Sequence, residues 1–385
     1  MRVAVVGRGG REHALRTVLS RTARVLSDDD DVAGADLVII GPEAPLVEGL
    51  ADRLRADGQA VFGPGADGAM LEGSKGWMKD VLVAAGVPTA RHRTFTKAEA
   101  GAAAGAGGMA EFIAELPGAA VKTDYLAAGK GVFVSADPEA LLADAQAKVE
   151  HGAVVIEELL TGPELSVLAV CNGKEFVLLP EARDHKRVGD GDMGPNTGGM
   201  GAFSPVPGTA PAIDAAALMV DATLAELQRR GIDYRGVLYA GLILTPDGPR
   251  MLEYNVRFGD PEAQVVLPRL TSDLAELLWA AAVGDPLPTP TATADACITV
   301  VLAAEGYPTS TRTGDPVAGI DQAEAVEGVT VFRAGIDAED RTSGGRVLNV
   351  TAVAPSLTEA RARAYEAITH ITFPGMHYRK DIAAS

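Results

Sequence analysis

The chain has 385 residues, more than one typical domain of roughly 100–200 residues, so we expect two to four structural units. With 34 Lys and Arg against 52 Asp and Glu, its net charge of −18 opposes non-specific binding to nucleic acid or to an anionic membrane. The two cysteines, Cys171 and Cys297, lie far apart in the sequence, so neither a disulfide framework nor a thiolate zinc site is expected. No apolar run reaches the roughly 18 residues of a membrane-spanning helix, and the apolar N-terminal stretch is too short for a signal peptide. We therefore expect a cytoplasmic enzyme that acts on small molecules.

The first 70 residues predict a small α/β unit. Apolar and β-branched runs at 2–6, 37–40 and 61–62 are typical of buried parallel strands, and helical patterns occupy 11–19 and 46–55 between them. This alternation of strands and helices predicts a doubly wound parallel sheet.

The middle of the chain predicts an α+β arrangement with one long loop. A helical pattern around Trp77 ends before Pro88, and strands are expected at 119–122, 131–134, 154–157 and 165–170. Residues 189–205 contain many Gly, Pro and Asn and little periodicity, which predicts a long loop, and loops of this length are usually functional or disordered. After it, the spacing of apolar residues predicts a helix over 213–227, followed by an antiparallel strand pair at 238–244 and 250–255.

The last hundred residues predict a separate α+β domain. The Pro- and Thr-rich stretch 286–293 is the best linker candidate, and strands are expected at 297–303, 329–332 and 347–353. Ser356, followed three residues later by Glu359, forms a capping box that opens a last helix.

A glycine loop with the sequence GRGGRE at 7–12 follows the first strand directly. A strand, a glycine loop and a helix N-terminus bring backbone N–H groups together at one point, which suits a phosphate or another anion. The dinucleotide fingerprint G-x-G-x-x-G is not completed, because Glu12 stands at its third glycine. Three alternatives remain open here: NAD or FAD, a tight turn without a ligand, and a phosphorylated small substrate, which we favour.

A second glycine-rich segment, AAGKGV at 127–132, lies between two predicted strands. It is not a Walker A loop, because Gly131 rather than Ser or Thr follows Lys130. The arrangement is typical of a flap that closes over a triphosphate, with Lys122 as a point charge on the preceding strand, and a solvated turn is the alternative. We expect residues 123–131 to form a hinged lid that orders when a nucleotide arrives.

Three polar side chains alternate with apolar ones in LEYNVR at 252–257. In an extended segment, the side-chain period of two puts Glu253, Asn255 and Arg257 on one face. Carboxylate and amide oxygens, together with phosphate oxygens, commonly hold Mg²⁺ in ATP-using sites. Arg257 is suited to a carboxylate or phosphate held by two hydrogen bonds, whereas a solvent-facing strand edge is the alternative interpretation.

Basic residues gather in DHKR at 184–187, beside the glycine-rich stretch 194–201. In so acidic a chain, the local patch of His185, Lys186 and Arg187 favours a phosphorylated ligand. A solvated charged face is the alternative.

Ten motifs occur in order along nearly the whole chain. They are GRGGREHAL (7–15), GPEAPLV (41–47), LEGSK (71–75), AAGKGV (127–132), IEELL (156–160), DHKRVGDGDMGPNTGGMGAFSP (184–205), YAGL (239–242), RFGDPEAQ (257–264), YPTSTRTGD (307–315) and SGGRVLNVTA (343–352). With these motifs the sequence resembles the phosphoribosylamine–glycine ligases, also called glycinamide ribonucleotide synthetases, of the ATP-grasp superfamily. The block at 184–205 and RFGDPE at 257–262 are specific to that family, whereas the other motifs fit the superfamily as a whole.

The resemblance implies a multi-domain ATP-grasp fold of α/β and α+β type. Its expected parts are an N-terminal doubly wound parallel-sheet domain that binds substrate (1–75), an ATP-grasp domain (76–288) with a small flap subdomain at about 110–165, and a C-terminal α+β domain (289–385). We expect a monomer that binds neither nucleic acid nor membrane.

The resemblance also implies the second step of purine synthesis. In that step ATP, glycine and 5-phosphoribosylamine give glycinamide ribonucleotide, ADP and phosphate through a glycyl phosphate. The implied cofactors are ATP and Mg²⁺ or Mn²⁺. Because the protein supplies no covalent group to such a step, positioning and charge neutralisation must dominate its catalysis.

Residue roles carry over from the family by position. ATP would contact Lys75, Lys122 and Lys130 at its phosphates, Glu157, Glu158 and Leu160 at adenine, and Glu164 at the ribose. The metal would bind Glu253 and Asn255, and the catalytic residues would be Lys122 and Arg257. Phosphoribosylamine would be received by Gly9, Gly10, Glu43, Asp184, Lys186 and Arg187, and Arg257 would also hold the glycine carboxylate or the acyl phosphate.

The sequence departs from the family pattern at two places. Between Leu15 and Pro42 it is shorter than is usual, which affects the N-terminal sheet and part of the phosphoribosylamine pocket. In the flap, Tyr125 replaces a usual glycine, which we expect to stiffen the lid. Two other functions stay open: a different ATP-grasp ligase, and a degenerate ATP-binding module without turnover.

Overall fold

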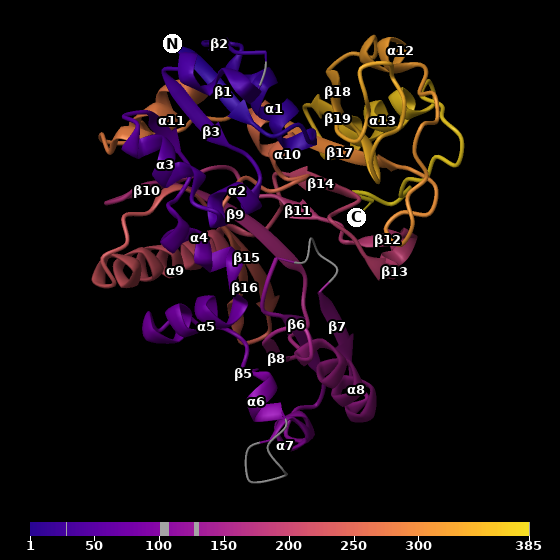
Figure 1. Cartoon of the computed structure of the whole chain (residues 1–385). Helices are drawn as coiled ribbons and strands as arrows, with labels where there is room; N and C mark the ends of the chain where they lie inside the picture. Colours follow the sequence, from indigo (N-terminus) through magenta and orange to yellow (C-terminus); the bar gives the residue numbers. More distant parts are fainter. Residues whose placement is uncertain (28, 101–107, 127–130, 385) are drawn as a thin grey trace.

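The computed structural model describes residues 1–27, 29–100, 108–126 and 131–384. Figure 1 shows the N-terminal and C-terminal parts side by side at the top, the central part beneath them, and the described residues of 92–158 projecting at the bottom. The candidate site lies between the N-terminal part, the C-terminal part and the projecting lower part.

The N-terminal sheet is parallel throughout. It contains β1 (Arg2–Val6), β2 (Arg24–Val25), β3 (Leu37–Ile40) and β4 (Ala60–Phe62), in the order β2-β1-β3-β4. Its helices are α1 (Gly10–Leu19), the 3-10 helix η1 (Asp29–Gly34), α2 (Glu43–Val47) and α3 (Leu50–Ala56). The inner strands β1 and β3 are apolar and buried, as parallel strands covered on both faces usually are. The predicted parallel α/β unit is confirmed.

The single helix expected over 46–55 is wrong, because the structure has two helices there. α2 ends at Val47 and α3 begins at Leu50, and Gly49 between them has a φ of 75°. A residue in this left-handed conformation ends a helix, and glycine adopts it without a Cβ clash. Leu46 and Ala51 are both fully buried, which explains why the apolar pattern continues across the break.

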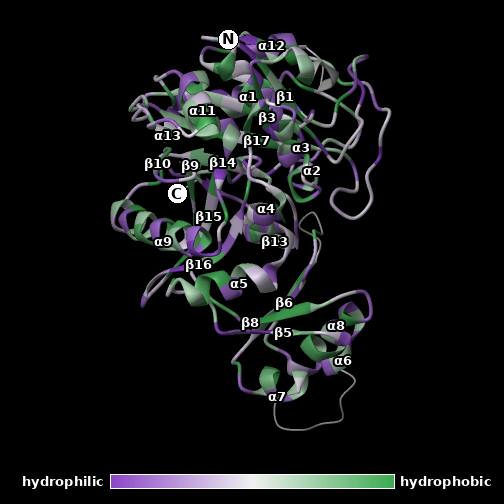
Figure 2. Cartoon of the chain, turned by 60° about the vertical axis from the view of Figure 1, so that its left-hand side comes forward, coloured by the Kyte–Doolittle hydropathy of each residue, from purple (hydrophilic) through white to green (hydrophobic). Residues whose placement is uncertain are grey.

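The lower part of the molecule is a small antiparallel sheet backed by helices. The sheet contains β5 (His92–Phe95), β8 (Val154–Glu158), β6 (Ala119–Thr123) and β7 (Val132–Ser135), in that order. Its helices are α6 (Lys97–Ala100), α7 (Met109–Ala114) and α8 (Pro138–Val149). Phe95, Phe112, Val121, Leu141 and Ile156 form the centre of a core of its own. Figure 2 shows hydrophobic residues along β6 at the middle of this sheet.

The central sheet is antiparallel and lies between two layers of helices. It contains β10 (Phe176–Leu178), β9 (Glu164–Asn172), β15 (Arg235–Thr245) and β16 (Gly248–Asn255), in that order. One layer holds α4 (Ala66–Gly73), α5 (Lys75–Ala84) and α9 (Ala210–Arg229), and the other holds α10 (Ala263–Val266), η3 (Leu267–Arg269) and α11 (Leu274–Val283). Along β9, Val167 and Ala169 join the core with α9, whereas Leu168 and Val170 join the core with α11. None of the described helices is long and apolar enough to cross a membrane.

The C-terminal sheet takes two strands from the middle of the chain. Its order is β11 (Arg183–Asp184), β14 (Gly201–Ser204), β17 (Ala296–Ala303), β19 (Arg346–Ala354) and β18 (Val329–Arg333). The helices here are α12 (Ile320–Glu324) and α13 (Leu357–Ile368). Ser356 caps α13 as predicted, because its Oγ accepts the Glu359 N–H at 3.2 Å.

The long loop expected over 189–205 is wrong. The segment contains η2 (Asp190–Asp192), β13 (Met193–Asn196), which pairs with β12 (Arg187–Gly189), and the strand β14. β14 is buried along its whole length because β17 lies beside it, with Gly201 opposite Val300 and Ser204 opposite Cys297. Such a strand depends on a partner a hundred residues away, so the local Gly and Pro content does not reveal it.

The C-terminal tail is tied to the β12–β13 hairpin by Arg379, whose side chain is 1% exposed. Its Nη1 donates to Asp192 Oδ1 at 2.6 Å, and its Nε and Nη2 donate to the two carboxylate oxygens of Asp381 at 2.7 Å. Asp381 in turn accepts the Gly191 N–H at 2.8 Å. The tail thereby holds the hairpin whose first strand begins at Arg187.

Replacing Arg379 with Ala should lower the free energy of unfolding by about 2 kcal/mol, because charge-assisted bonds from one guanidinium join two chain segments. Urea denaturation monitored by circular dichroism measures this change. The control is Lys97→Ala, which removes an exposed ion pair with Glu150 and should change stability by less than about 0.5 kcal/mol. Equal effects of the two substitutions would show that Arg379 does not tie the tail to the hairpin.

Candidate active site

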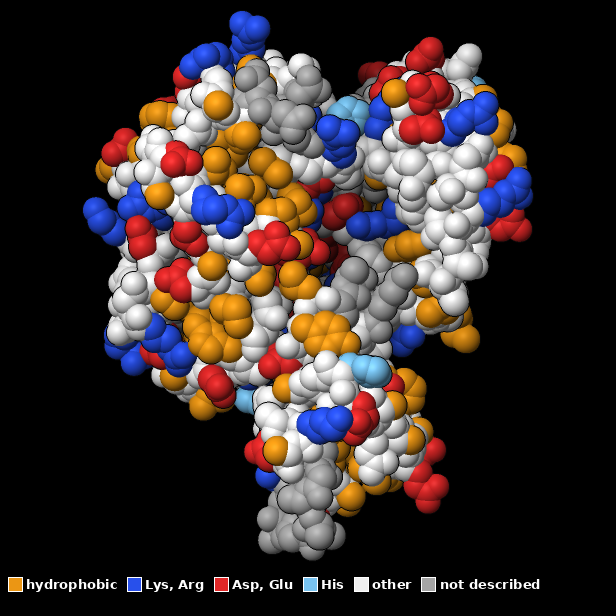
Figure 3. Space-filling view, viewed as in Figure 1, with side chains coloured by type: hydrophobic (Ala, Val, Ile, Leu, Met, Phe, Trp, Pro, Cys, Tyr) orange, Lys and Arg blue, Asp and Glu red, His pale blue; other side chains and the backbone are white. Residues whose placement is uncertain are grey.

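The polar residues singled out in the sequence converge on Glu253 in β16. Burial raises the pKa of Glu253, but four cations lower it by more than burial raises it. The pKa therefore lies below its ordinary value. These cations are Lys186, Lys122, Lys75 and Arg257, and they come from four separate segments of the chain. Figure 3 shows acidic and basic side chains in the hollow between the N-terminal, C-terminal and lower parts. The fold thus collects positive charge around one carboxylate.

Arg257, which follows β16, is held by carboxylates from the N-terminal part. Its Nη2 lies 2.9 Å from Glu72 Oε1, and its Nε lies 3.5 Å from Glu43 Oε2. Although burial opposes it, these carboxylates raise the pKa of Arg257 above its ordinary value, so the guanidinium stays charged. Sequence reasoning missed Glu72, although it lies in the LEGSK motif at 71–75. It also accepts the Val256 N–H at 2.8 Å, which places the backbone just before Arg257.

Glu253 and Asn255 lie on the same face of β16, as the period of two predicts, and both are half-buried. Asn255 Oδ1 accepts a hydrogen bond from Arg257 Nη2 at 3.1 Å and keeps a second lone pair. Within the described residues there is no cluster of three or more His, Cys, Asp or Glu that could hold a metal ion. A carboxylate and an amide oxygen are the donors that Mg²⁺ accepts where phosphate oxygens complete its shell, so the residues fit such an ion.

Glu157 is enclosed by two lysines. Lys79 Nζ lies 2.8 Å from Glu157 Oε2 and Lys122 Nζ lies 2.9 Å from Glu157 Oε1, with side-chain exposures of 0% for Lys79 and 1% for Glu157. Its carboxylate therefore faces the lysines rather than an open adenine pocket, so any contribution of Glu157 to adenine comes from its backbone. Sequence reasoning missed Lys79; the signal was a lysine three residues before Leu82, on the buried face of α5.

Lys186 joins two acidic residues that the sequence had singled out. Its Nζ lies 3.0 Å from Glu164 Oε2 and 3.0 Å from Asp184 Oδ2. Burial lowers the pKa of Lys186, but these two carboxylates raise it well above the ordinary value, so Lys186 is charged. Arg187 does not join them in the described contacts: its Nη1 donates to Gly194 O at 2.8 Å, within the β12–β13 hairpin.

The glycine loop at 7–12 is filled by its own Glu12, which is 2% exposed. Glu12 Oε2 accepts the Gly9 N–H at 2.7 Å, and a Cβ on Gly41 would collide with the same carboxylate. A dinucleotide pyrophosphate needs this space and these N–H groups, so the NAD and FAD alternative is wrong. The Gly9 N–H is thus bonded to Glu12 here, and the contact of Gly9 with phosphoribosylamine stays a prediction.

Two buried amides lie against Gly10, the first residue of α1. Gln264 and Asn349 are both 0% exposed. Their side-chain amides are the groups that a Cβ added to Gly10 would meet first. Within the described part of the chain, Gln264 Oε1 and both polar atoms of the Asn349 side chain have no hydrogen-bond partner. Buried amides of this kind are usually satisfied, so the unsatisfied atoms beside the N-terminus of α1 are unusual.

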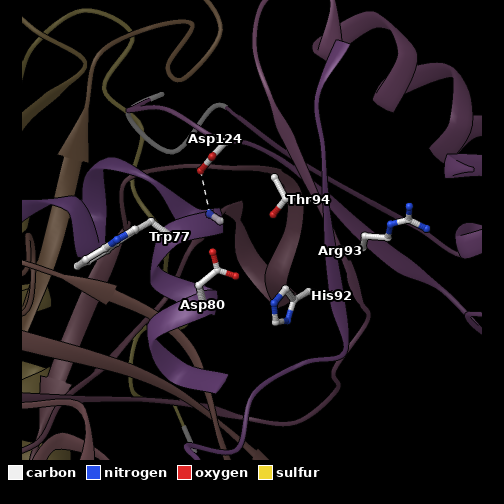
Figure 4. A pocket seen from close by; sticks show the side chains of 7 residues that line it. Trp77, Asp80, His92, Arg93, Thr94 and Asp124 are labelled. Atoms are coloured by element: carbon white, nitrogen blue, oxygen red, sulfur yellow. Dashed lines mark hydrogen bonds between the residues drawn. The ribbon is translucent and has the colours of Figure 1, made fainter. Parts of the chain in front are cut away.

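The N-terminus of α5, where Lys75 stands, is tied to the end of β6 by Asp124. Asp124 Oδ1 accepts the Gly76 N–H at 2.9 Å and the Ser74 hydroxyl at 3.0 Å. Figure 4 shows Asp124 beside a cavity of about 380 Å³ between α5 and β5, which Asp80 and His92 also line. None of the residues predicted to bind ATP or substrate lines this cavity, so it lies outside the site.

The other residues expected around adenine lie at the end of β8. Glu158 Oε1 accepts the Arg91 N–H at 2.9 Å, and Leu160 follows the strand and is half-exposed. Lys130 belongs to residues 127–130, which lie outside the described residues. Its predicted contact with phosphate and the lid expected over 123–131 therefore stay predictions.

Three profiles of one enzyme family match the chain. They are the N domain of phosphoribosylglycinamide synthetase over residues 30–72, its ATP-grasp (A) domain over 73–263 and its C domain over 297–385. The chain belongs to this family. The resemblance found in the motifs and the predicted ATP-grasp fold are thereby confirmed, and the chain is an ATP-dependent ligase.

Individual relatives agree with the family assignment. The chain is 44% identical to phosphoribosylamine–glycine ligase of Streptomyces coelicolor, over 100% of this chain and 99% of that one, and 44% identical to that of Leifsonia xyli, over 100% of both. The crystal structure of the ligase from Thermotoga maritima is 32% identical with a TM-score of 0.86, over 99% of this chain and 100% of that one. The alignment with the Streptomyces ligase has 432 positions, 47 more than the 385 residues here.

Replacing Asp124 with Ala should destabilise the protein by about 1 kcal/mol, because the first turn of α5 loses the acceptor of its Gly76 N–H. Thermal unfolding measures the change. Asp80→Ala is the matched control, since Asp80 lines the same cavity without bonding to that turn, and its expected change is within about 0.5 kcal/mol. A wild-type melting curve for Asp124→Ala would refute this role.

Proposed function

We propose that the chain joins glycine to 5-phosphoribosylamine and gives glycinamide ribonucleotide, ADP and phosphate, as part of purine synthesis. The observation that carries the proposal is the gathering of Lys75, Lys122, Lys186 and Arg257 around Glu253. Four cations beside one or two oxygen ligands provide for the charge of a nucleoside triphosphate and its metal. The family membership supplies the substrates, which the relatives carry in their names.

ATP is assigned to the space between the small sheet and the central sheet. Lys75 and Lys122 neutralise its phosphates together with Lys130, the backbone of 157–160 contacts adenine, and Glu164 takes the ribose hydroxyls. Glu253 and Asn255 hold Mg²⁺ or Mn²⁺, which when bound neutralises the phosphate charge that develops during transfer. The lysine charge and the two oxygen donors support this assignment.

Glycine and phosphoribosylamine are assigned to the side of the N-terminal part. Arg257 binds the glycine carboxylate, one oxygen of which attacks the γ-phosphorus as the bond to ADP breaks. The amine of phosphoribosylamine then attacks the acyl carbon, phosphate leaves, and the amine gives up a proton. In this scheme Arg257 keeps both partners in line, because Glu72 and Glu43 fix its guanidinium.

Phosphoribosylamine is assigned to Gly9 and Gly10 of the glycine loop, together with Glu43, Asp184, Lys186 and Arg187. The unsatisfied amides of Gln264 and Asn349 next to Gly10 support a polar ligand there. Lys186, charged between Asp184 and Glu164, supports a phosphorylated one.

The organisation of the molecule is part of the same proposal. We divide the chain into 1–75, 76–288 and 289–385, with the flap subdomain at about 110–165. The two free, buried cysteines support a reducing, cytoplasmic location. We also propose a monomer without nucleic-acid or membrane partners, which the net charge of −18 supports.

The purified chain should release ADP from ATP only when glycine and phosphoribosylamine are both present, because the acyl phosphate is formed for that amine. A coupled ADP assay with each substrate left out measures this. Release with another carboxylate and amine would indicate a different ATP-grasp ligase. ATP binding without any turnover would indicate a degenerate module.

Replacing Glu253 with Gln should raise the Mg²⁺ concentration for half-maximal activity roughly tenfold, since a neutral amide offsets less metal charge than a carboxylate. Activity is measured across a Mg²⁺ titration. The control Glu305→Gln changes an exposed carboxylate in the C-terminal part and should follow the wild-type curve. Activity of Glu253→Gln within twofold of wild type at low Mg²⁺ would remove Glu253 from the metal site.

A further inference from the structure

We propose that Lys79 is a positioning residue for ATP: it shares the carboxylate of Glu157 and so leaves Lys122 with positive charge and donors for the nucleotide phosphates. The inference rests on the assignment of ATP to this site under the proposed function. Nothing in the family motifs assigns a role to Lys79, which stands one turn beyond LEGSK at 71–75.

The geometry begins with complete burial of Lys79. Its Nζ donates to Thr89 Oγ1 at 2.7 Å, lies 2.8 Å from Glu157 Oε2, and lies 3.5 Å from the carbonyl oxygen of Leu252. An ammonium has three N–H donors, and these three oxygens account for them. Lys79 therefore has no donor left for a ligand and acts only through its neighbours.

Lys122 is placed differently. Its Nζ lies 2.9 Å from the second oxygen, Glu157 Oε1, and its side chain is 6% exposed against 0% for Lys79. Burial lowers the pKa of Lys122, but Glu157 and Glu253 raise it above its ordinary value, so it stays charged. An ammonium has three N–H donors and Glu157 Oε1 takes at most one of them, so Lys122, unlike Lys79, keeps donors for a ligand.

Charge explains why two lysines are needed. One carboxylate between two ammonium groups leaves a net charge of plus one, and in an enclosed site this charge is felt strongly by a phosphate. If Lys79 were neutral, Glu157 and Lys122 would form a neutral ion pair. Lys122 would then attract ATP less strongly, because its charge would be balanced by Glu157 alone.

Stability does not account for Lys79. Burial and the charge of Lys122 lower the pKa of Lys79 to about 8. The carboxylates of Glu157 and of Glu253 on β16 act in the opposite direction. A lysine whose folded pKa lies below the unfolded value makes folding less favourable at neutral pH, where it is charged in both states.

The experiment compares Lys79→Gln with Lys148→Gln and measures ATP binding by calorimetry without glycine or phosphoribosylamine. Glutamine keeps a donor for Glu157 and removes the charge. Lys148 is the matched control, because its Nζ donates to the carbonyl oxygen of Val121, the residue before Lys122 on β6, and makes none of the described contacts with Glu157. We expect ATP to bind about tenfold more weakly to Lys79→Gln and within twofold of wild type to Lys148→Gln.

A double-mutant cycle with Lys122→Gln tests whether Lys79 acts through Lys122. In the Lys122→Gln background, the added Lys79→Gln change should weaken ATP binding by less than twofold. Wild-type affinity of Lys79→Gln, or fully additive losses in the cycle, would overturn the proposal. If Lys79→Gln does not fold, Lys79→Arg, which keeps the charge, should bind ATP within threefold of wild type, and a tenfold loss there would also overturn it. A wild-type chain that binds no ATP would instead count against the proposed function.

Discussion

A carboxylate surrounded by cations is the constraint on which the site depends. Burial raises the pKa of Glu253, but the attraction of Lys186, Lys122, Lys75 and Arg257, which come from separate segments, lowers it by more than that, so the half-buried carboxylate stays ionised. Three of these cations have close acidic partners of their own: Glu157 for Lys122, Glu164 and Asp184 for Lys186, and Glu72 for Arg257. The alternation of charges holds the elements together and leaves positive potential where a triphosphate would lie.

The topology of the sheets explains how this arrangement forms. Residues 183–204 add β11 and β14 to the C-terminal sheet, and Lys186, two residues after Asp184 of β11, reaches Glu164 of β9 in the central sheet. The tail residues Arg379 and Asp381 then hold the β12–β13 hairpin from the other side. Residues of the C-terminal part thus take part in shaping a site whose ligands come mostly from earlier in the chain.

The motif-bearing residues could be predicted from the sequence because their spacing is local. The period of two in β16 puts Glu253 and Asn255 on one face. Glu12 in place of the third glycine counts against a dinucleotide site, and in the structure its carboxylate fills the loop. Errors arose where a distant partner or one backbone angle decided the structure. β14 forms because β17 lies beside it, and the helix expected over 46–55 is split by Gly49.

By itself the sequence determined the class of protein and the residue types that carry the chemistry, because composition and periodicity are properties of neighbouring residues. The resemblance of its motifs to those of a known family indicated the ATP-grasp fold. Tertiary structure alone decided which charges meet. Lys79 and Glu72 looked like ordinary residues of α5 and α4, yet folding puts Lys79 against Glu157, 78 positions away, and Glu72 against Arg257. The energy of an ion pair depends on distance and on exclusion of water, and neither quantity is written in the local order of residues.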